Sequence, residues 1–193
     1  DIILRPRIDG RVTEISENFV PGGFVKEGDI LVKIDRADYQ NSVRQMESAL
    51  QQAQSELDIE LGRQDVAERE YEMLDQKLTE ENKALVMREP QLAAARASVL
   101  SAQAALDQAR LELERTEIAA PFDAQILTRG VNVGSRIDPG DELARLVGID
   151  EYWVTVTVPV ARVARISFPE NGEPGARVKI RNRTAWPDGI TRE

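Results

Sequence analysis

The sequence contains no cysteine and no histidine, and aromatic residues make up only 5% of its 193 residues. Without cysteine there are no disulfides and no thiolate metal sites, and without either residue type the commonest catalytic bases, nucleophiles and transition-metal ligands are missing. Three methionines are too few for a thioether relay that carries copper or silver ions. We therefore expect no enzyme activity, no cofactor and no metal site. With few aromatic residues, the core must consist mainly of Val, Ile, Leu and Ala, which suits slim elements better than one large globule.

Excess positive charge and long apolar runs are also lacking. The formal net charge is −9, whereas nucleic acid and anionic membranes both require a basic face, so we expect no nucleic acid and no anionic membrane as a direct partner. No segment approaches the roughly 18–20 apolar residues of a membrane span, and no signal peptide stands at Asp1. Because the chain starts in a strand-like run, we expect it to be part of a longer mature protein whose anchor lies outside these residues.

The sequence contains one pattern twice. Residues 6–35 read PRIDGRVTEISENFVPGGFVKEGDILVKID, and residues 121–147 read PFDAQILTRGVNVGSRIDPGDELARLV. Ordinary turn chemistry would explain a single Gly-Asp step before an apolar run. An ordered match over the whole motif favours a common origin, with a small β domain divided into two halves. The corresponding positions are Gly10 and Ala124, Val12 and Ile126, Gly22 and Gly134, Val25 and Ile137, Gly28 and Gly140, Asp29 and Asp141, and Leu31 and Leu143.

Between the halves, apolar or small residues recur at alternating spacings of four and three. A repeat of 3.5 residues makes a narrow stripe, here called the seam, which a helix buries against a second helix in a left-handed supercoil. Two such stretches in succession predict an antiparallel hairpin. The seam weakens at Glu60 and Gln64, beside Gly62. Its predicted positions are Tyr39, Val43, Met46, Leu50, Ala53, Leu57, Ala67, Tyr71, Leu74 and Leu78, then Leu92, Ala95, Val99, Ala102, Leu106, Ala109 and Leu113.

The tip of the hairpin is expected near residues 76–82, where Thr79 is suited to cap a following helix. Pro90 conflicts with a continuous second arm, because proline is not tolerated in a helix interior. Either that arm kinks at Pro90, or it begins there and residues 79–89 form a separate short helix. We favour the kinked, nearly full-length arm, whose roughly 40 residues would reach about 60 Å.

After residue 116 the pattern returns to β structure. Residues 152–160 alternate with the period of a strand, a short helical turn is expected at 161–166, and another strand at 176–180. These segments predict the start of a second β domain, a barrel. The expected fold class is therefore α+β and elongated.

The order of these parts, with the strings RPRIDGRV and ERTEIAAPFDAQI, resembles the membrane-fusion, or periplasmic adaptor, family of tripartite exporters. The resemblance implies a split lipoyl/biotinyl-like β domain with an inserted antiparallel coiled-coil hairpin, followed by the start of a β-barrel domain. The implied boundaries are residues 1–36 for the first half-domain, 37–116 for the hairpin, 117–148 for the second half-domain and 149–193 for the partial barrel.

An intact lipoyl or biotinyl domain carries its cofactor on a lysine between its halves. Here Arg36 stands where the carrier pattern Asp-Lys-Ala would place that lysine. A guanidinium stays protonated and is no nucleophile for forming the amide. Lys33 is interpreted as an ordinary strand residue, so we expect no covalent cofactor.

The resemblance also implies contact residues at the tip. Efflux adaptors of this family dock on the outer-membrane channel through an Arg, a Leu four residues on and a Ser seven beyond. Arg69 and Met73 take the first two places, and Glu80 stands in place of the Ser. Residues 56–81 are also rich in Asp and Glu, which is typical either of a solvated helix face or of an acidic tip that meets a complementary partner. The candidate contact residues are Arg69, Met73, Leu74, Leu78 and Glu80.

The resemblance implies a periplasmic adaptor that links an inner-membrane transporter, of the proton-driven resistance-nodulation-division type, to an outer-membrane channel. A ring of copies, six by resemblance, would enclose the conduit, and a segment outside this chain would attach it to the inner membrane. Three alternatives stay open: an adaptor for an ATP-driven exporter or type I secretion system, a biotin or lipoyl carrier domain, and a plain coiled-coil spacer.

Overall fold

The computed structural model describes residues 1–73, 79–149, 155–163, 166 and 168, without the side chains of residues 80 and 81. The chain forms two compact units, residues 1–151 and 152–193. The strand expected at 176–180 and most of the expected barrel lie outside the described residues.

Eight short strands of the first unit form two four-stranded sheets in which all paired strands are antiparallel. One sheet has the order β1-β8-β6-β3 and the other β5-β4-β2-β7. Each sheet therefore contains strands from both sides of the helical insertion. The strands are β1 Ile2–Leu4, β2 Gly10–Ile15, β3 Phe24–Val25, β4 Ile30–Ile34, β5 Glu117–Ala119, β6 Ala124–Arg129, β7 Arg136–Ile137 and β8 Ala144–Gly148.

The two sheets are related by the repeat seen in the sequence. Exchanging each strand for its counterpart in the other half (β1 with β5, β2 with β6, β3 with β7, β4 with β8) converts one strand order into the other. The backbone bonds follow the same rule: the Gly22 N–H donates to the Ile126 carbonyl at 2.7 Å, and the Gly134 N–H donates to the Val12 carbonyl at 2.9 Å. The structure thus confirms that the two sequence motifs are structural repeats.

The matching Gly-Asp turns explain why these residue types recur. Gly28 and Gly140 have φ of 84° and 104°, where a side chain would be strained. The following aspartates close the turns, since Asp29 Oδ2 accepts from the Lys26 N–H at 2.8 Å and Asp141 Oδ2 accepts from the Asp138 N–H at 2.9 Å.

The core of this β domain is aliphatic, as the scarcity of aromatic residues predicts, with Phe19 as its one fully buried aromatic ring among the described residues. Both halves contribute to one continuous cluster, so neither half buries its apolar face alone. The fully buried members include Leu31, Ile34 and Val32 from the first half, and Ala124, Ile126, Ala144 and Leu146 from the second.

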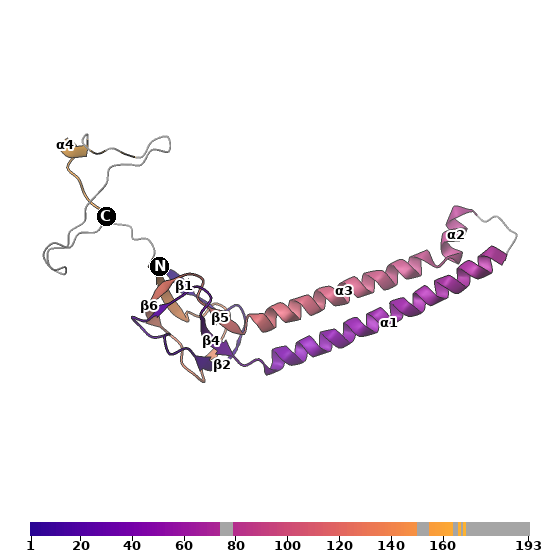
Figure 1. Cartoon of the computed structure of the whole chain (residues 1–193), viewed down its shortest axis with the longest axis horizontal. Helices are drawn as coiled ribbons and strands as arrows, with labels where there is room; N and C mark the ends of the chain where they lie inside the picture. Colours follow the sequence, from indigo (N-terminus) through magenta and orange to yellow (C-terminus); the bar gives the residue numbers. More distant parts are fainter. Residues whose placement is uncertain (74–78, 150–154, 164–165, 167, 169–193) are drawn as a thin grey trace. The chain divides into compact units, whose positions relative to one another are not determined.

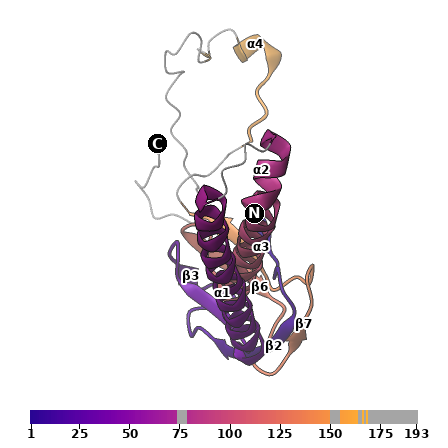
Figure 2. The same cartoon turned by 90° about the vertical axis from the view of Figure 1, so that its right-hand side faces the viewer.

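Helices α1 (Ala37–Met73) and α3 (Glu89–Glu114) lie side by side and antiparallel, as Figures 1 and 2 show. The predicted hairpin is therefore confirmed. Each predicted seam position on α1 from Tyr39 to Tyr71, and on α3 from Leu92 to Leu113, is buried or half-buried. Leu74 and Leu78 lie outside the described residues.

The expectation of a kinked, nearly full-length second arm is wrong. A separate short helix, α2 (Glu80–Val86), precedes α3, and Met87 and Arg88 lie between them. In a continuous helix, the ring of Pro90 would clash with the carbonyl of Val86, four residues earlier, and that is where α2 ends. Pro90 instead lies in the first turn of α3, where the N–H it lacks has no helical partner. Thr79 takes the N-cap position of α2 but makes no side-chain capping bond.

The strand expected at residues 152–160 is not present where the structure describes this segment. Residues 155–159 have no regular structure, and helix α4 (Val160–Val163) begins one residue before the expected helical turn. Period-two alternation indicates a strand only where a neighbouring strand supplies hydrogen bonds, and none pairs with the described residues here.

Candidate functional site

The hairpin is fixed to the β domain where the chain leaves it and returns. The Ile34 N–H donates to the Thr116 carbonyl at 2.8 Å, and the Tyr39 hydroxyl donates to the Asp9 carbonyl at 2.8 Å. Burial is the main cause of a raised pKa for Tyr39. Both ends of the hairpin are therefore held by hydrogen bonds to the chain around them.

Arg36, which stands at the position of a carrier lysine, lies at the root of the hairpin, where the hairpin joins the β domain. Its Nη1 lies 2.8 Å from Oε1 of Glu117, which joins the start of α1 to β5. Lys33 lies on β4, and its Nζ is 2.7 Å from Oε2 of Glu14 on the neighbouring strand β2. The hydrogen bond to Glu14 raises the pKa of Lys33, so its amine stays protonated. Both basic side chains serve as ion-pair partners within the β domain.

Farther along the hairpin, the seam changes character at Glu60. This residue is only 7% exposed although it is charged. Arg88 reaches it from the other arm, with Nε 2.6 Å from Oε1 and Nη2 3.1 Å from Oε2. Arg63 adds a longer contact of 3.5 Å. The hydrogen bond from Arg88 is the main reason that the pKa of Glu60 lies below its ordinary value.

Arg88 also marks the break between α2 and α3. Its backbone is left-handed, with φ 55° and ψ 27°, a conformation that costs energy for a residue with a Cβ. Strained backbone persists only where its surroundings hold it. Here the Arg88 N–H donates to the Leu85 carbonyl at 3.1 Å, its carbonyl accepts from the Leu92 N–H at 3.0 Å, and its side chain is fixed by the two-point ion pair with Glu60. We call Glu60, Arg88 and the residues between α2 and α3 the elbow.

This pair was not predicted from the sequence. Glu60 was expected to be a weak point of the seam, whereas the structure shows a seam position filled by an ion pair. The available signal was an acidic residue in phase with the seam, together with an arginine just before the helix-breaking Pro90. Nothing in the sequence connected the two, because they lie in different arms.

The predicted tip residues are placed only in part. Arg69 and Met73 lie one turn apart on the same face of α1, as residues four apart must. Arg69 Nη2 is 2.6 Å from Oδ2 of Asp65, with both side chains exposed, and Met73 is 85% exposed at the end of α1. Leu74 and Leu78 lie outside the described residues, and of Glu80 only the backbone, at the start of α2, is described.

A second stripe of apolar residues also runs along the distal half of α1. Ile59, Val66 and Met73 are exposed, and with Gly62 and Arg69 they follow the same alternating spacing as the seam on another face. Beside the elbow this stripe borders a hollow of about 450 Å³. The hollow is lined by Ile59, Gly62, Arg63, Val66, Ala67, Glu70 and Arg88. This face was not predicted from the sequence.

Among the helices that the structure describes, none combines the length and the apolar character needed to cross a membrane.

An interleaved β domain with a helical hairpin inserted between its halves defines the class of the protein, a barrel-sandwich hybrid that carries a hairpin. A family profile described as "RND MFP, barrel-sandwich hybrid domain" matches residues 2–149. The chain therefore belongs to the membrane fusion protein family, the periplasmic adaptors of efflux systems.

Among curated proteins, the chain is 26% identical over 185 residues to multidrug resistance protein MdtA of Klebsiella pneumoniae, covering 95% of this chain and 43% of MdtA. It is 29% identical over 153 residues to the uncharacterized protein YdhJ of Escherichia coli, covering 79% of this chain and 51% of YdhJ. The chain thus spans about half the length of these relatives or less.

Solved structures share the fold. A putative efflux transporter from Bacteroides eggerthii superposes with a TM-score of 0.58 at 23% identity, covering 77% of this chain and 40% of that one. A MacA–MexA chimera that contains the Pseudomonas aeruginosa MexA α-hairpin gives 0.53 at 24% identity, covering 77% and 48%. At these identities the likeness establishes the fold alone.

Proposed function

We propose that this chain is the central part of a periplasmic adaptor that links an inner-membrane transporter to an outer-membrane channel in a tripartite efflux pump. The observation that carries the proposal is the hairpin itself, anchored at its root by Arg36–Glu117 and Tyr39–Asp9 and presenting exposed apolar residues at its distal end. At 1.5 Å per residue, the 37 residues of α1 extend about 55 Å. A helix pair of that length supplies reach, and its distal surface supplies a contact.

Each part has a role in this proposal. Residues 1–36 and 117–148 form a lipoyl-like domain that closes the hairpin root, residues 37–116 form the hairpin with its tip at 76–82, and residues 149–193 begin a β-barrel domain. Because one narrow hairpin cannot enclose a channel, the function requires a ring of copies, and we propose six. The ring would stand in the periplasm, attached to the inner membrane by a segment beyond this chain.

The proposed transporter is of the resistance-nodulation-division type, which the description of the matching family profile supports. An ATP-driven exporter would need the same parts, and the captured transporter would separate the two. A biotin or lipoyl carrier would need a modifiable lysine at the junction, where Arg36 is ion-paired with Glu117.

The proposed contact residues at the tip are Arg69, Met73, Leu74, Leu78 and Glu80. Arg69 and Met73 support this assignment because they share one exposed face of α1, and Ile59 and Val66 extend that face toward the elbow. Glu80 in place of a Ser makes the contact more acidic, so we expect a partner surface with complementary charge.

Photo-crosslinking in cells tests the proposal. A photoreactive amino acid replaces Met73 in the full-length protein, and in a matched control it replaces Leu100, which is 71% exposed on α3. We expect capture of an outer-membrane channel from position 73 and much less capture from position 100. Equal capture from both positions, or capture of no envelope protein from position 73, would contradict the proposal.

A further inference from the structure

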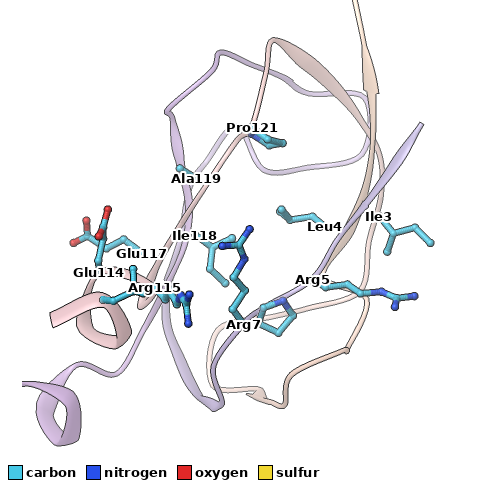
Figure 3. Close-up of a pocket in the computed structure, with 12 residues that line it drawn as sticks. Ile3, Leu4, Arg5, Arg7, Glu114, Arg115, Glu117, Ile118, Ala119 and Pro121 are labelled. Atoms are coloured by element: carbon cyan, nitrogen blue, oxygen red, sulfur yellow. The ribbon is translucent and has the colours of Figure 1, made fainter. Parts of the chain in front are cut away.

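A hollow of about 540 Å³ lies between β1 and β5 (Figure 3). Both are outermost strands of their sheets, so this is where the two sheets stand unjoined at one side of the β domain. Its volume falls within the range of roughly 300–1,000 Å³ that is typical of small-molecule sites.

Two facing walls of the hollow are apolar. Leu4 and Ile118 line it from the two facing strands and pack with the core, and Pro121 lies farther along the same gap (Figure 3). Leu111, near the end of α3, is 39% exposed and extends this surface toward the hairpin. An apolar group placed here would shield these side chains from water.

The charged side chains around the hollow are mainly basic. The guanidinium of Arg7 lies in the middle of the gap between Leu4 and Ile118, and Arg115 lies at the side nearest α3, whereas Arg5 points away (Figure 3). The carboxylates of Glu114 and Glu117 lie on the same side as α3 and point away from the gap (Figure 3), and Glu117 is paired with Arg36.

The arginines have no anionic partner within the described part of the chain. None of Arg5, Arg7 and Arg115 takes part in an ion pair there. In a chain of net charge −9, unpaired guanidinium groups beside an apolar floor form a local site for an anion.

Added strands do not fit this place well. β1 and β5 each contain three residues, and Pro6 and Pro121 follow closely after them. Short edges next to proline offer few backbone groups for pairing. Recognition must therefore come from side chains.

We propose that this hollow binds a small amphipathic organic anion, with its carboxylate or similar head on Arg7 and Arg115 and its apolar part on Leu4, Ile118 and Pro121. The anion would accept hydrogen bonds from the guanidinium groups, while its apolar part covers the gap between the sheets. The inference goes beyond the proposed adaptor function and does not depend on it.

Calorimetric titration of the 193-residue chain with dodecanoate, below its micelle concentration, tests the proposal. We expect saturable binding of one molecule per chain, and affinity about tenfold or more weaker for Arg7→Glu, because a charge-assisted bond becomes a repulsion. Arg96→Glu, the same charge change at an exposed site on α3, leaves affinity unchanged. Arg7→Gln, which removes only the charge, gives an intermediate loss. Circular dichroism establishes that each variant is folded.

Other probes define what would overturn the proposal. Dodecyl maltoside, which has the same tail without the charge, should bind at least tenfold more weakly than dodecanoate, because it cannot pair with Arg7. Equal binding of the neutral probe, or equal loss in Arg96→Glu, would reduce the site to general surface attraction. In two-dimensional NMR spectra, dodecanoate should shift the amide signals of Leu4 and Ile118. Three other results would also overturn the proposal. Contacts from residues 152–193 to Ile118 would assign the hollow to the chain itself, and binding of phosphatidylglycerol vesicles without binding of dodecanoate would assign it to a membrane. Concentration-dependent dimers that are lost in Arg7→Glu would assign it to a second copy.

Discussion

The proximal and distal halves of the hairpin follow one sequence period but are held together differently. Near the root, Val43, Leu106 and Ala109 form a buried aliphatic cluster. Beyond the middle, the seam passes through Glu60, and Arg88 of the other arm completes it. Aliphatic packing acts at any pH and tolerates small shifts, whereas a two-point ion pair requires one geometry and a charged carboxylate. The proximal half is therefore stabilised by apolar packing, whereas the ion pair in the distal half fixes the bend between α2 and α3.

The largest expected effect comes from breaking the aliphatic half. The side chain of Leu106 is only 2% exposed. Leu106→Ala should lower the free energy of unfolding by about 2–5 kcal/mol, because it removes buried apolar surface and leaves a cavity. The matched control Leu100→Ala, at a site 71% exposed, should change it by about 0.5 kcal/mol or less. Urea unfolding followed by helical circular dichroism measures both. Similar losses in the two variants would mean that the seam is not the stabilising contact.

The next effect comes from breaking the elbow. Because the chain lacks cysteine, spin labels on cysteines introduced at Asp58 and Leu85 report only the distance between α1 and α2. We expect one narrow distribution in the parent chain and a broader one in Glu60→Gln, which cannot hold Arg88 by charge. Asp65→Asn, which breaks the exposed pair with Arg69, should leave the distribution narrow. A narrow distribution in Glu60→Gln would contradict the role of the ion pair.

A smaller, reversible effect follows from pH. The pKa of Glu60 is lowered in the folded chain, mainly by the hydrogen bond from Arg88. Its stabilisation is therefore fully present above the carboxyl pKa of the unfolded chain and is lost as pH falls through the lower, folded value. The same spin-label distance distribution should stay narrow at neutral pH and broaden only when the pH falls below the ordinary range of carboxyl pKa values. Glu60→Gln should show no such transition, and a transition of equal size in that variant would assign it to other groups.

The smallest effect is expected for the surface pair of Asp65 and Arg69. Both side chains are exposed, so water and salt screen their attraction. Asp65→Asn should lower the free energy of unfolding by about 0.5 kcal/mol or less in urea unfolding. A loss as large as that of Leu106→Ala would indicate a packing role for Asp65 that its exposure does not suggest.

Local patterns predicted much of the fold. The seam positions from Tyr39 to Tyr71 and from Leu92 to Leu113 depend on helical spacing alone, and the matching turns at Gly28 and Gly140 depend on glycine and aspartate in fixed order. Both signals are contained in short stretches of sequence.

The features that the sequence did not predict depend on contacts between distant residues. Glu60 and Arg88 meet only because the two arms pack, and the separate helix α2 was underestimated because a kink at Pro90 and a new start are equally compatible with the spacing. The hollow at Arg7 and Arg115 requires β1 and β5 to lie on opposite sides of one gap. For the candidate tip, the family resemblance pointed to Arg69 and Met73, and the structure places both on one face of α1. The exposed stripe through Ile59 and Val66 was recognised only once the seam was known to lie on another face.

The exchange of strands between the two halves has a consequence for how the chain folds during synthesis. β3 pairs with β6, so that Phe24 lies opposite Gln125, and the β domain cannot be completed until the residues after the hairpin have emerged. Closing a flexible loop as long as the insertion would cost about 4 kcal/mol in chain entropy. Pairing α1 with α3, starting where the two arms are closest in sequence, would bring the two ends of that loop together step by step. The helical hairpin would then place the second half of the β domain next to the first half during folding.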